Sequence, residues 1–207
     1  MNNNLFPISK EGWSYIGYSV ALFLVLGFFD LEFLQFFSFL LILFFLYVFR
    51  NPEREMPAFE KGGVVSPVDG RVTDIHEDTK TTQITLESNY LDVSVLRVPI
   101  GSVISEIKEQ KGASLSKNSL KSKFLNEQLN ISFEDSQKRV VNVSHVVNLN
   151  FLGVLHYLIN SQKVIQGSRY GVMLKGTTVV SIPKNSKVNV QIGSEIKACE
   201  SVIAYLS

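Results

Sequence analysis

The chain of 207 residues contains one cysteine and three histidines. A single cysteine excludes an internal disulfide framework and a cysteine-based zinc site. The histidines are His76, His145 and His156, and none has a metal-like partner at close spacing in the sequence, so we expect no metal. The formal net charge is only +1. This value argues against a nucleic-acid partner, because nucleic-acid binders normally carry a basic excess.

Common catalytic signatures are absent as well. The sequence has no P-loop, no Rossmann glycine fingerprint, no nucleophile elbow and no HExxH zinc motif. We interpret His76 as a solvated strand end, His145 as a sheet residue with satisfied hydrogen bonds, and His156 as part of a helix. Cys199 lies among small residues near the C-terminus, and we interpret it as a structural residue.

Hydrophobic residues are concentrated near the N-terminus, where residues 1–57 hold 11 of the 15 phenylalanines. The 18 positions between Glu11 and Asp30 carry no charge. The 17 positions between Glu32 and Arg50 carry none either. A helix of this length reaches about 25 Å, slightly less than a hydrocarbon core of about 30 Å. We therefore expect residues 1–57 to form a membrane-anchoring helical hairpin of two transmembrane or re-entrant helices.

The charges flanking these runs predict an orientation. Lys10, Arg50 and Arg54 fall at the open end of the hairpin, whereas its bend carries only acids. Positively charged flanks prefer the cytoplasmic side, so we expect the hairpin in the cytoplasmic (inner) membrane and residues 58–207 on its cytoplasmic side. A signal peptide is disfavoured because no small-residue cleavage site follows. Two buried helices of a soluble core are disfavoured because the second run has no wide polar face.

Residues 58–207 consist of short strand-forming runs separated by Gly, Pro, Asn and Ser. We expect a mainly β (α+β) protein in which this domain is an antiparallel β sandwich or barrel-like domain with few helices. One helix is expected around residues 151–160, and the polar stretch 109–123 is expected to form a loop or flap. The expected strands cover residues 71–75, 83–86, 92–98, 103–107, 140–150, 172–174, 179–182, 188–192 and 202–206.

Several informative pieces occur in a fixed order along the chain, at residues 6–13, 49–57, 65–72, 97–99, 124–127, 167–171, 176–178 and 193–200. The most specific are a Phe-Arg-Asn-Pro-Glu-Arg run and a Ser-Pro-x-Asp-Gly-x-Val run, which follow the apolar hairpin. In this order and spacing the pieces resemble the short, two-segment form of the phosphatidylserine decarboxylase family. The resemblance extends over nearly the whole chain, from Phe6 to Leu206.

The resemblance implies a proenzyme, or zymogen, that cuts itself. In this family a serine preceded by glycine attacks the preceding carbonyl, and the resulting ester eliminates to give a long β and a short α subunit. The new α terminus becomes a pyruvoyl group, which acts as the electron sink when phosphatidylserine loses carbon dioxide and becomes phosphatidylethanolamine. The resemblance therefore implies a lyase of phospholipid biosynthesis. A membrane phospholipid is its expected partner, and a β/α pair or a homo-oligomer is its expected assembly.

The catalytic residues of the family are matched to this sequence one at a time. The family aspartate matches Asp69, whereas the family histidine, which assists self-cleavage and proton transfer, falls on Ser94. The nucleophilic serine falls on Thr177, which follows Gly176. The resemblance thus makes Asp69, Ser94, Gly176 and Thr177 the catalytic candidates. It also makes Thr177 the source of the covalent α-keto cofactor.

The departures from the family pattern have chemical consequences. Threonine retains a hydroxyl, so it can make the same attack, but elimination would give a 2-oxobutanoyl end in place of pyruvoyl. Ser94 does not titrate near neutral pH, and the loss of general acid–base help commonly costs about 10²–10⁴-fold in rate. The family arginine after the nucleophile falls on Thr178, and a basic pair falls on Leu152 and Gly153.

Three functions remain open at this point. The first is a membrane-bound phosphatidylserine decarboxylase that is cut between Gly176 and Thr177. The second is a catalytically inactive relative, a pseudoenzyme that binds lipid or scaffolds a partner enzyme. The third is a carrier module of the biotinyl type, which is weak because the sequence offers no evident carrier lysine or loop histidine.

Overall fold

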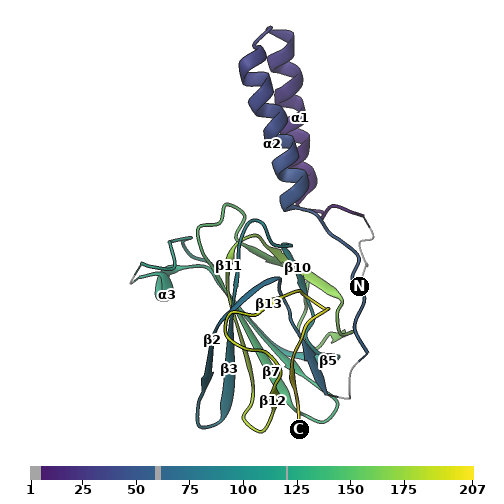
Figure 1. Ribbon diagram of the computed structural model, residues 1–207, viewed down its shortest axis with the longest axis vertical. Coiled ribbons are helices and arrows are strands. Elements are labelled where there is room, and N and C mark those ends of the chain that lie inside the picture. The colour runs from purple at the N-terminus through teal and green to yellow at the C-terminus, as the bar shows by residue number, and fades with distance from the viewer. Residues whose placement is uncertain (1–5, 59–61, 120) are drawn as a thin grey trace. The chain divides into compact units, whose positions relative to one another are not determined.

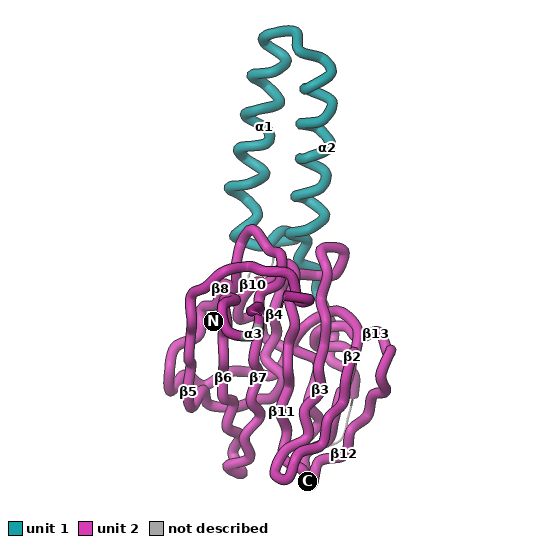
Figure 2. Tube along the Cα trace, turned by 90° about the vertical axis from the view of Figure 1, so that its left-hand side faces the viewer, with its two compact units in different colours: residues 1–53 teal, residues 54–207 magenta. Residues whose placement is uncertain are grey.

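The computed structural model describes residues 6–58, 62–119 and 121–207, and consists of a helical hairpin and a mainly β part (Figure 1). The chain divides into two compact units, one ending at Glu53 and the other beginning at Arg54 (Figure 2). Each unit is described by itself below.

The first unit is the predicted helical hairpin. Helix α1 (Gly12–Phe28) and helix α2 (Glu32–Val48) each contain 17 residues. The bend lies at Asp30, whose φ of 55° falls in the left-handed region. In the part of the chain that the structure describes, no helix combines the length and the apolar character needed to cross a membrane.

Contacts between the two helical arms hold the hairpin together. A Cβ on Gly12 would lie 2.5 Å from Cβ of Phe49, so only glycine allows this approach. The Ser38 hydroxyl donates to the carbonyl of Ser19 at 3.1 Å. The chain segments before α1 and after α2 are paired, since Asn51 N–H donates to the Pro7 carbonyl at 2.7 Å. Residues 6–13 and the start of the piece at residues 49–57, which both carry the resemblance, are therefore adjacent in this unit.

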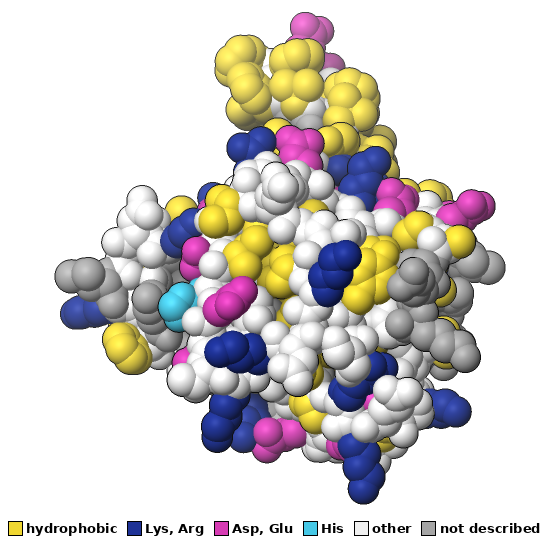
Figure 3. Space-filling view, turned by 60° about the horizontal axis from the view of Figure 1, so that its bottom comes forward, with side chains coloured by type: hydrophobic (Ala, Val, Ile, Leu, Met, Phe, Trp, Pro, Cys, Tyr) yellow, Lys and Arg dark blue, Asp and Glu magenta, His cyan; other side chains and the backbone are white. Residues whose placement is uncertain are grey.

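Most of the hairpin surface is apolar. Tyr18, Phe28 and Phe33 are each at least three-quarters exposed. Hydrophobic side chains cover most of the hairpin surface seen in Figure 3. On the remaining surface in that view, the Lys and Arg side chains are scattered among uncharged ones, in keeping with the small net charge.

The second unit contains three antiparallel sheets, which confirms the predicted antiparallel β architecture. The large sheet has eight strands in the order β13 (Glu195–Ile196), β2 (Gly70–Glu77), β3 (Thr81–Ser88), β11 (Gly176–Pro183), β7 (Val140–Val147), β6 (Gln128–Glu134), β5 (Ser102–Gln110) and β9 (Lys163–Val164). One small sheet has the order β1 (Gly63–Val65), β14 (Val202–Tyr205) and β12 (Lys187–Val188). The other has the order β4 (Val95–Arg97), β10 (Arg169–Met173) and β8 (Val154–His156).

One hydrophobic core joins the three sheets. Strand alternation directs every second residue of the large sheet inward, and Ile131 on β6 and Val180 on β11 are buried in this way. Leu96 of one small sheet and Ile203 of the other belong to the same core cluster. Burying a side chain of this size stabilises the fold by about 1.5–3 kcal/mol. The small sheets therefore cover one face of the large sheet and leave the alternate residues of β11 on its other face.

The predicted helix around residues 151–160 is wrong. This segment forms a turn followed by β8, so His156 lies on a strand. The Asn150 side chain accepts a hydrogen bond from Leu152 N–H at 3.0 Å and donates to the Gly153 carbonyl at 3.2 Å. This turn, in which Gly153 has a φ of +78°, directs the chain to pair with β10.

Several strand predictions also needed correction. Strand β7 ends at Val147, before residue 150, and residues 189–192 are not in a strand. Strand β6 was missed, although its alternating Leu129, Ile131 and Phe133 all face the core. The strands β1, β8, β9 and β13 were missed because two or three residues are too short to show a period.

The loop predicted over residues 109–123 is shorter in the structure, because residues 109 and 110 belong to β5 and residues 122 and 123 to a short helix. We call residues 111–119 of this loop the flap; residue 120 lies outside the described residues. The flap leads into the short helix α3 (Ser122–Leu125). The side chain of the fully buried Asn126 holds the flap in place. The Asn126 amide nitrogen donates to the carbonyls of Leu115 at 2.9 Å and Val147 at 2.7 Å, and its oxygen accepts from Leu115 N–H at 2.9 Å. One side chain thus ties the flap to the end of β7.

We predict that Asn126→Ala releases the flap. The substitution leaves the buried carbonyl of Val147 and the part-buried backbone groups of Leu115 without the amide, and an unsatisfied buried group costs about 1–3 kcal/mol. Hydrogen–deuterium exchange should therefore accelerate at the amides of residues 113–119. Asn142→Ala is the matched control, because Asn142 is an exposed β7 residue on the same sheet. Wild-type exchange rates in the flap of Asn126→Ala would contradict this account.

Candidate functional site

The predicted cleavage point lies at the start of the central strand β11. Gly176 is paired with Ser88 on β3 and Val147 on β7. A Cβ at Gly176 would lie 2.6 Å from the carbonyl oxygen of Val146, so a larger residue would push β7 away. Gly176 is therefore required by packing as well as by the proposed chemistry.

Thr177 and Thr178 face opposite sides of the sheet. Burial alternates along β11, and Thr178 shares the core face with Val180. Thr177 is half-buried on the other face, where it lies opposite Glu87 of β3 and Val146 of β7. The candidate nucleophile is thus outside the hydrophobic core.

A side-chain amide holds the Thr177 hydroxyl. Asn148, which follows the last residue of β7, has its amide group 2.8 Å from Thr177 Oγ1. With its nitrogen toward Thr177, Asn148 donates to the hydroxyl and its oxygen accepts from Asn126 Nδ2 at 3.2 Å. With its oxygen toward Thr177, it accepts from the hydroxyl at 2.8 Å and from the Thr177 N–H at 3.3 Å. Both orientations fix the position of Oγ1 beside the Gly176 peptide.

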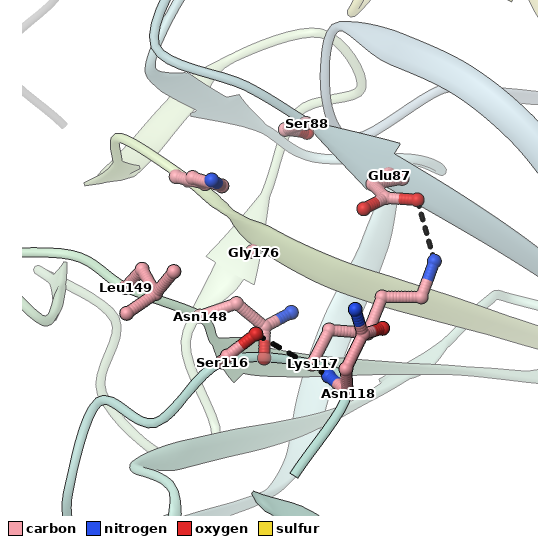
Figure 4. A pocket seen from close by; sticks show the side chains of 9 residues that line it. Glu87, Ser88, Ser116, Lys117, Asn118, Asn148, Leu149 and Gly176 are labelled. Atoms are coloured by element: carbon pink, nitrogen blue, oxygen red, sulfur yellow. Dashed lines mark hydrogen bonds and ion pairs between the residues drawn. The ribbon is translucent and has the colours of Figure 1, made fainter.

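A polar pocket of about 230 Å³ opens beside Gly176 (Figure 4). Its walls come from β3, from the flap, from the loop after β7 and from the start of β11. Figure 4 shows Glu87 and Asn148 on opposite sides of the strand at Gly176. The lining residues are Glu87, Ser88, Ser116, Lys117, Asn118, Asn148, Leu149, Lys175 and Gly176.

Charged groups of both signs line this pocket. Lys117 Nζ on the flap lies 2.6 Å from the Glu87 carboxylate, and both side chains are partly exposed. Lys175 Nζ lies 5.9 Å from the ring centroid of Tyr90, a cation–π geometry. The pocket can therefore accept a ligand that carries both positive and negative groups.

Asp69 lies in the turn between β1 and β2, where its carboxylate is nearly buried. The carboxylate accepts from Arg54 Nη2 at 2.6 Å and from the backbone N–H of Ala198 at 2.8 Å. Its backbone carbonyl accepts from the hydroxyl of Ser88, which is the cross-strand partner of Gly176. The backbone of Asp69 is therefore hydrogen-bonded to the residue that pairs with Gly176, whereas its carboxylate forms an ion pair with Arg54. The side chain of Arg54, which the sequence analysis assigns to the positive flank of the hairpin, is only 6% exposed in this ion pair.

Ser94 is buried just before β4. Its carbonyl accepts from the N–H of Met173 at 2.9 Å. Met173 in turn lies against Gly176, since a Cβ there would be 2.6 Å from the Met173 sulfur. The structure thus brings the backbones of Ser94 and Asp69 to the same end of β11 as Gly176 and Thr177.

His145 is fully buried on β7, opposite Thr178. Its Nδ1 lies 2.8 Å from Thr178 Oγ1, and its Nε2 lies 2.6 Å from the Tyr170 hydroxyl. This confirms the interpretation of His145 as a satisfied sheet residue. Burial lowers the pKa of His145 to about 3, with a smaller contribution from the charge of His156. Because His145 faces the core, it lies across the sheet from the Thr177 side chain.

The remaining singled-out residues lie elsewhere. His76 is exposed on β2, as predicted. His156 lies on β8 with Nε2 3.8 Å from the Glu109 carboxylate. Cys199 is buried, and burial raises the pKa of its thiol. Sequence reasoning missed Glu87, Lys117 and Asn148, because only the strand register and the flap bring them to Thr177.

Comparisons with known proteins identify the family of the chain. The family model for phosphatidylserine decarboxylase matches residues 41–204. The chain belongs to the phosphatidylserine decarboxylase family. The match covers every candidate site residue.

Curated relatives match over nearly their full length. The phosphatidylserine decarboxylase proenzyme of Geobacter metallireducens is 29% identical over 218 residues, covering 100% of both chains. The proenzyme of Paraburkholderia xenovorans is 27% identical, covering 96% of this chain and 97% of the relative. The proenzyme of Neisseria gonorrhoeae (strain NCCP11945) is 28% identical, covering 99% of this chain and 82% of the relative. No solved structure matches the chain.

We predict that acid destabilises the fold through His145. Its folded pKa of about 3 lies below the unfolded value of 6.5, so between these pH values only the unfolded chain binds a proton at this residue. The free energy of unfolding therefore falls as the pH drops through this window, by up to about 1.4 kcal/mol per pH unit from this group.

Denaturant unfolding between pH 7 and pH 4 measures this effect. His145→Gln should show a shallower pH dependence than the wild type, even if it is less stable at neutral pH. His76→Gln, which changes an exposed histidine on the same sheet, should keep the wild-type dependence. An equal dependence in His145→Gln and the wild type would refute the assignment.

Proposed function

We propose that this protein is a phosphatidylserine decarboxylase that makes its own α-keto group at Thr177. Family membership supports the reaction class. The observation that carries the proposal is the 2.8 Å contact between Asn148 and Thr177 Oγ1, which holds a hydroxyl beside the Gly176 peptide. Both Asn148 and Gly176 line the polar pocket. The word proenzyme in the relatives' names is consistent with self-processing of this chain.

The residues present fit such a group. Thr177 Oγ1 attacks the Gly176 carbonyl carbon, and as the amide C–N bond breaks the hydroxyl proton passes to the amide nitrogen, which leaves an ester. Elimination then removes the Cα proton of residue 177 and breaks its Cβ–O bond, which releases the Gly176 carboxylate. Water replaces the nitrogen, which leaves as ammonia. The products are residues 1–176 and residues 177–207, the latter with a 2-oxobutanoyl end.

The keto group, once formed, supplies an electron sink for decarboxylation of an amine-bearing substrate. The chain's own residues bind and orient that substrate. Lys175 offers positive charge to the phosphate or carboxylate of the head group, and the carboxylate of Glu87 favours its ammonium group. Asn148, which lines the pocket, orients the side chain of residue 177.

We further propose that the hairpin attaches the protein to the cytoplasmic (inner) membrane and leaves the β unit on the cytoplasmic side. An exposed apolar surface of this kind favours a membrane or a partner protein. Phe28 is 83% exposed and Phe33 is 75% exposed. Lys10 and Arg50 still provide the positive flank that favours the cytoplasmic side. Because both helices have 17 residues, insertion into one leaflet fits the hairpin better than a full crossing.

A second candidate function is that of a catalytically inactive relative which binds lipid or scaffolds a partner. Two observations favour it. The family histidine is replaced by the buried Ser94, and the buried His145 faces away from Thr177. In this case the pocket would bind a phospholipid head group without any chain cleavage.

Substitution of Thr177 separates the two functions. Thr177→Ala removes the hydroxyl, so we expect an uncut chain and formation of phosphatidylethanolamine at the background rate. Thr177→Ser keeps the hydroxyl without the methyl group, so we expect cleavage at least as fast as in the wild type. Chain length by gel and product formation from phosphatidylserine in detergent micelles are the two measurements.

Thr85→Ala is the matched control, because Thr85 is a half-buried threonine on the same face of neighbouring β3. It should be cut and active like the wild type. An uncut wild-type chain, together with a Thr177→Ala variant that has no phenotype, would refute the decarboxylase and favour the inactive relative.

A further inference from the structure

The proposed self-cleavage needs a group that accepts the Thr177 hydroxyl proton near neutral pH, and serine at position 94 cannot provide it. Two buried titratable side chains are engaged elsewhere. The His145 ring lies on the core face between Thr178 and Tyr170. The Asp69 carboxylate is held by Arg54 and by the N–H of Ala198.

The other two histidines are also remote from Thr177 along the sheet. His76 pairs with Gln83 near the far end of the β2–β3 hairpin, six positions along β2 from Gly70. His156 belongs to the small sheet and lies near Glu109 on β5. Neither residue is part of the pocket at Gly176.

Glu87 is the titratable residue that the strand register brings to Thr177. The β3–β11 pairing puts the two residues directly opposite each other, so their side chains share the outer face of the sheet. Opposed residues of an antiparallel pair have Cβ atoms about 4.5–5.5 Å apart, which a glutamate side chain can bridge. Glu87 also lines the pocket at Gly176 and is 28% exposed, so water can enter the same space (Figure 4).

Lys117 of the flap orients the Glu87 carboxylate. Its Nζ lies 2.6 Å from Glu87 Oε2, as the dashed line in Figure 4 shows. A carboxylate has two oxygens and accepts several hydrogen bonds, so the second oxygen stays available for a hydroxyl donor. Strand β2 is the other neighbour of β3, and its Arg71 lies opposite Glu87. Arg71 forms its ion pair with Glu195 at 3.3 Å.

We infer that Glu87 is the general base of self-cleavage and takes the role of the histidine that is missing at position 94. This inference rests on the proposed function. As Thr177 Oγ1 bonds to the Gly176 carbonyl carbon, the Glu87 carboxylate accepts the hydroxyl proton. When the C–N bond breaks, the carboxyl group gives this proton to the leaving nitrogen of residue 177. Glu87 is therefore regenerated as a carboxylate.

Glu87→Gln tests the inference, because it keeps the size of the side chain and removes its basicity. The full-length protein is expressed at low temperature and purified, and the fraction of cut chain is followed over time. General acid–base help is worth about 10²–10⁴-fold, and we expect cleavage to slow by a factor of that order. Glu77→Gln, which changes an exposed glutamate on β2 of the same sheet opposite Thr82, should be cut at the wild-type rate.

Chemical rescue distinguishes a base from a merely structural residue. Glu87→Ala leaves space beside the pocket, so added acetate should accelerate cleavage of this variant in proportion to acetate concentration. Chloride at equal ionic strength should not. A structural role predicts no such rescue, and this second variant keeps the test decisive if Glu87→Gln is poorly folded.

The outcomes separate the inference from the proposed function. A wild-type chain that is cut, with Glu87→Gln cut at the same rate, overturns the inference alone. A Glu87→Ala variant that acetate does not accelerate overturns it too. A wild-type chain that is never cut overturns both the inference and the proposed function.

Discussion

The antiparallel register of β11 between β3 and β7 is the constraint on which the site depends. It puts Gly176 opposite Ser88 and directs Thr177 to the same face as Glu87. A slip of one residue would exchange the two faces of the strand, which would bury Thr177 and send Thr178 outward. The core residues of β11, such as Val180, prevent this slip because they would become exposed.

The two faces of the sheet divide the polar residues by role. On the core face, His145 is a neutral hydrogen-bonding group between Thr178 and Tyr170. An unpaired imidazole at this depth would be costly, so its partners are required for stability. On the outer face, the charged and amide groups around Thr177 keep access to solvent through the pocket. The self-cleavage that we propose therefore takes place on the outer face of the sheet, whereas the buried histidine of β7 lies on the core face.

Part of this arrangement could be predicted from the sequence. Charge-free runs predicted the helical hairpin, and alternation predicted most of the long strands. The helix expected around residues 151–160 failed because the turn at Asn150 and the pairing with β10 outweigh the local pattern. The family resemblance predicted Gly176 and Thr177 as the cleavage point, and this stays a prediction. Glu87 and Asn148 could not be found in this way, because cross-strand register and loop packing, which one sequence does not display, bring them to Thr177.

The mass of the protein purified from cells in detergent tests the central claim most directly. The account predicts two chains, residues 1–176 and residues 177–207. The shorter chain should be lighter than a threonine-terminated peptide by one ammonia, and it should react with hydrazine through its keto end. A single, unmodified chain of 23.3 kDa would contradict the account.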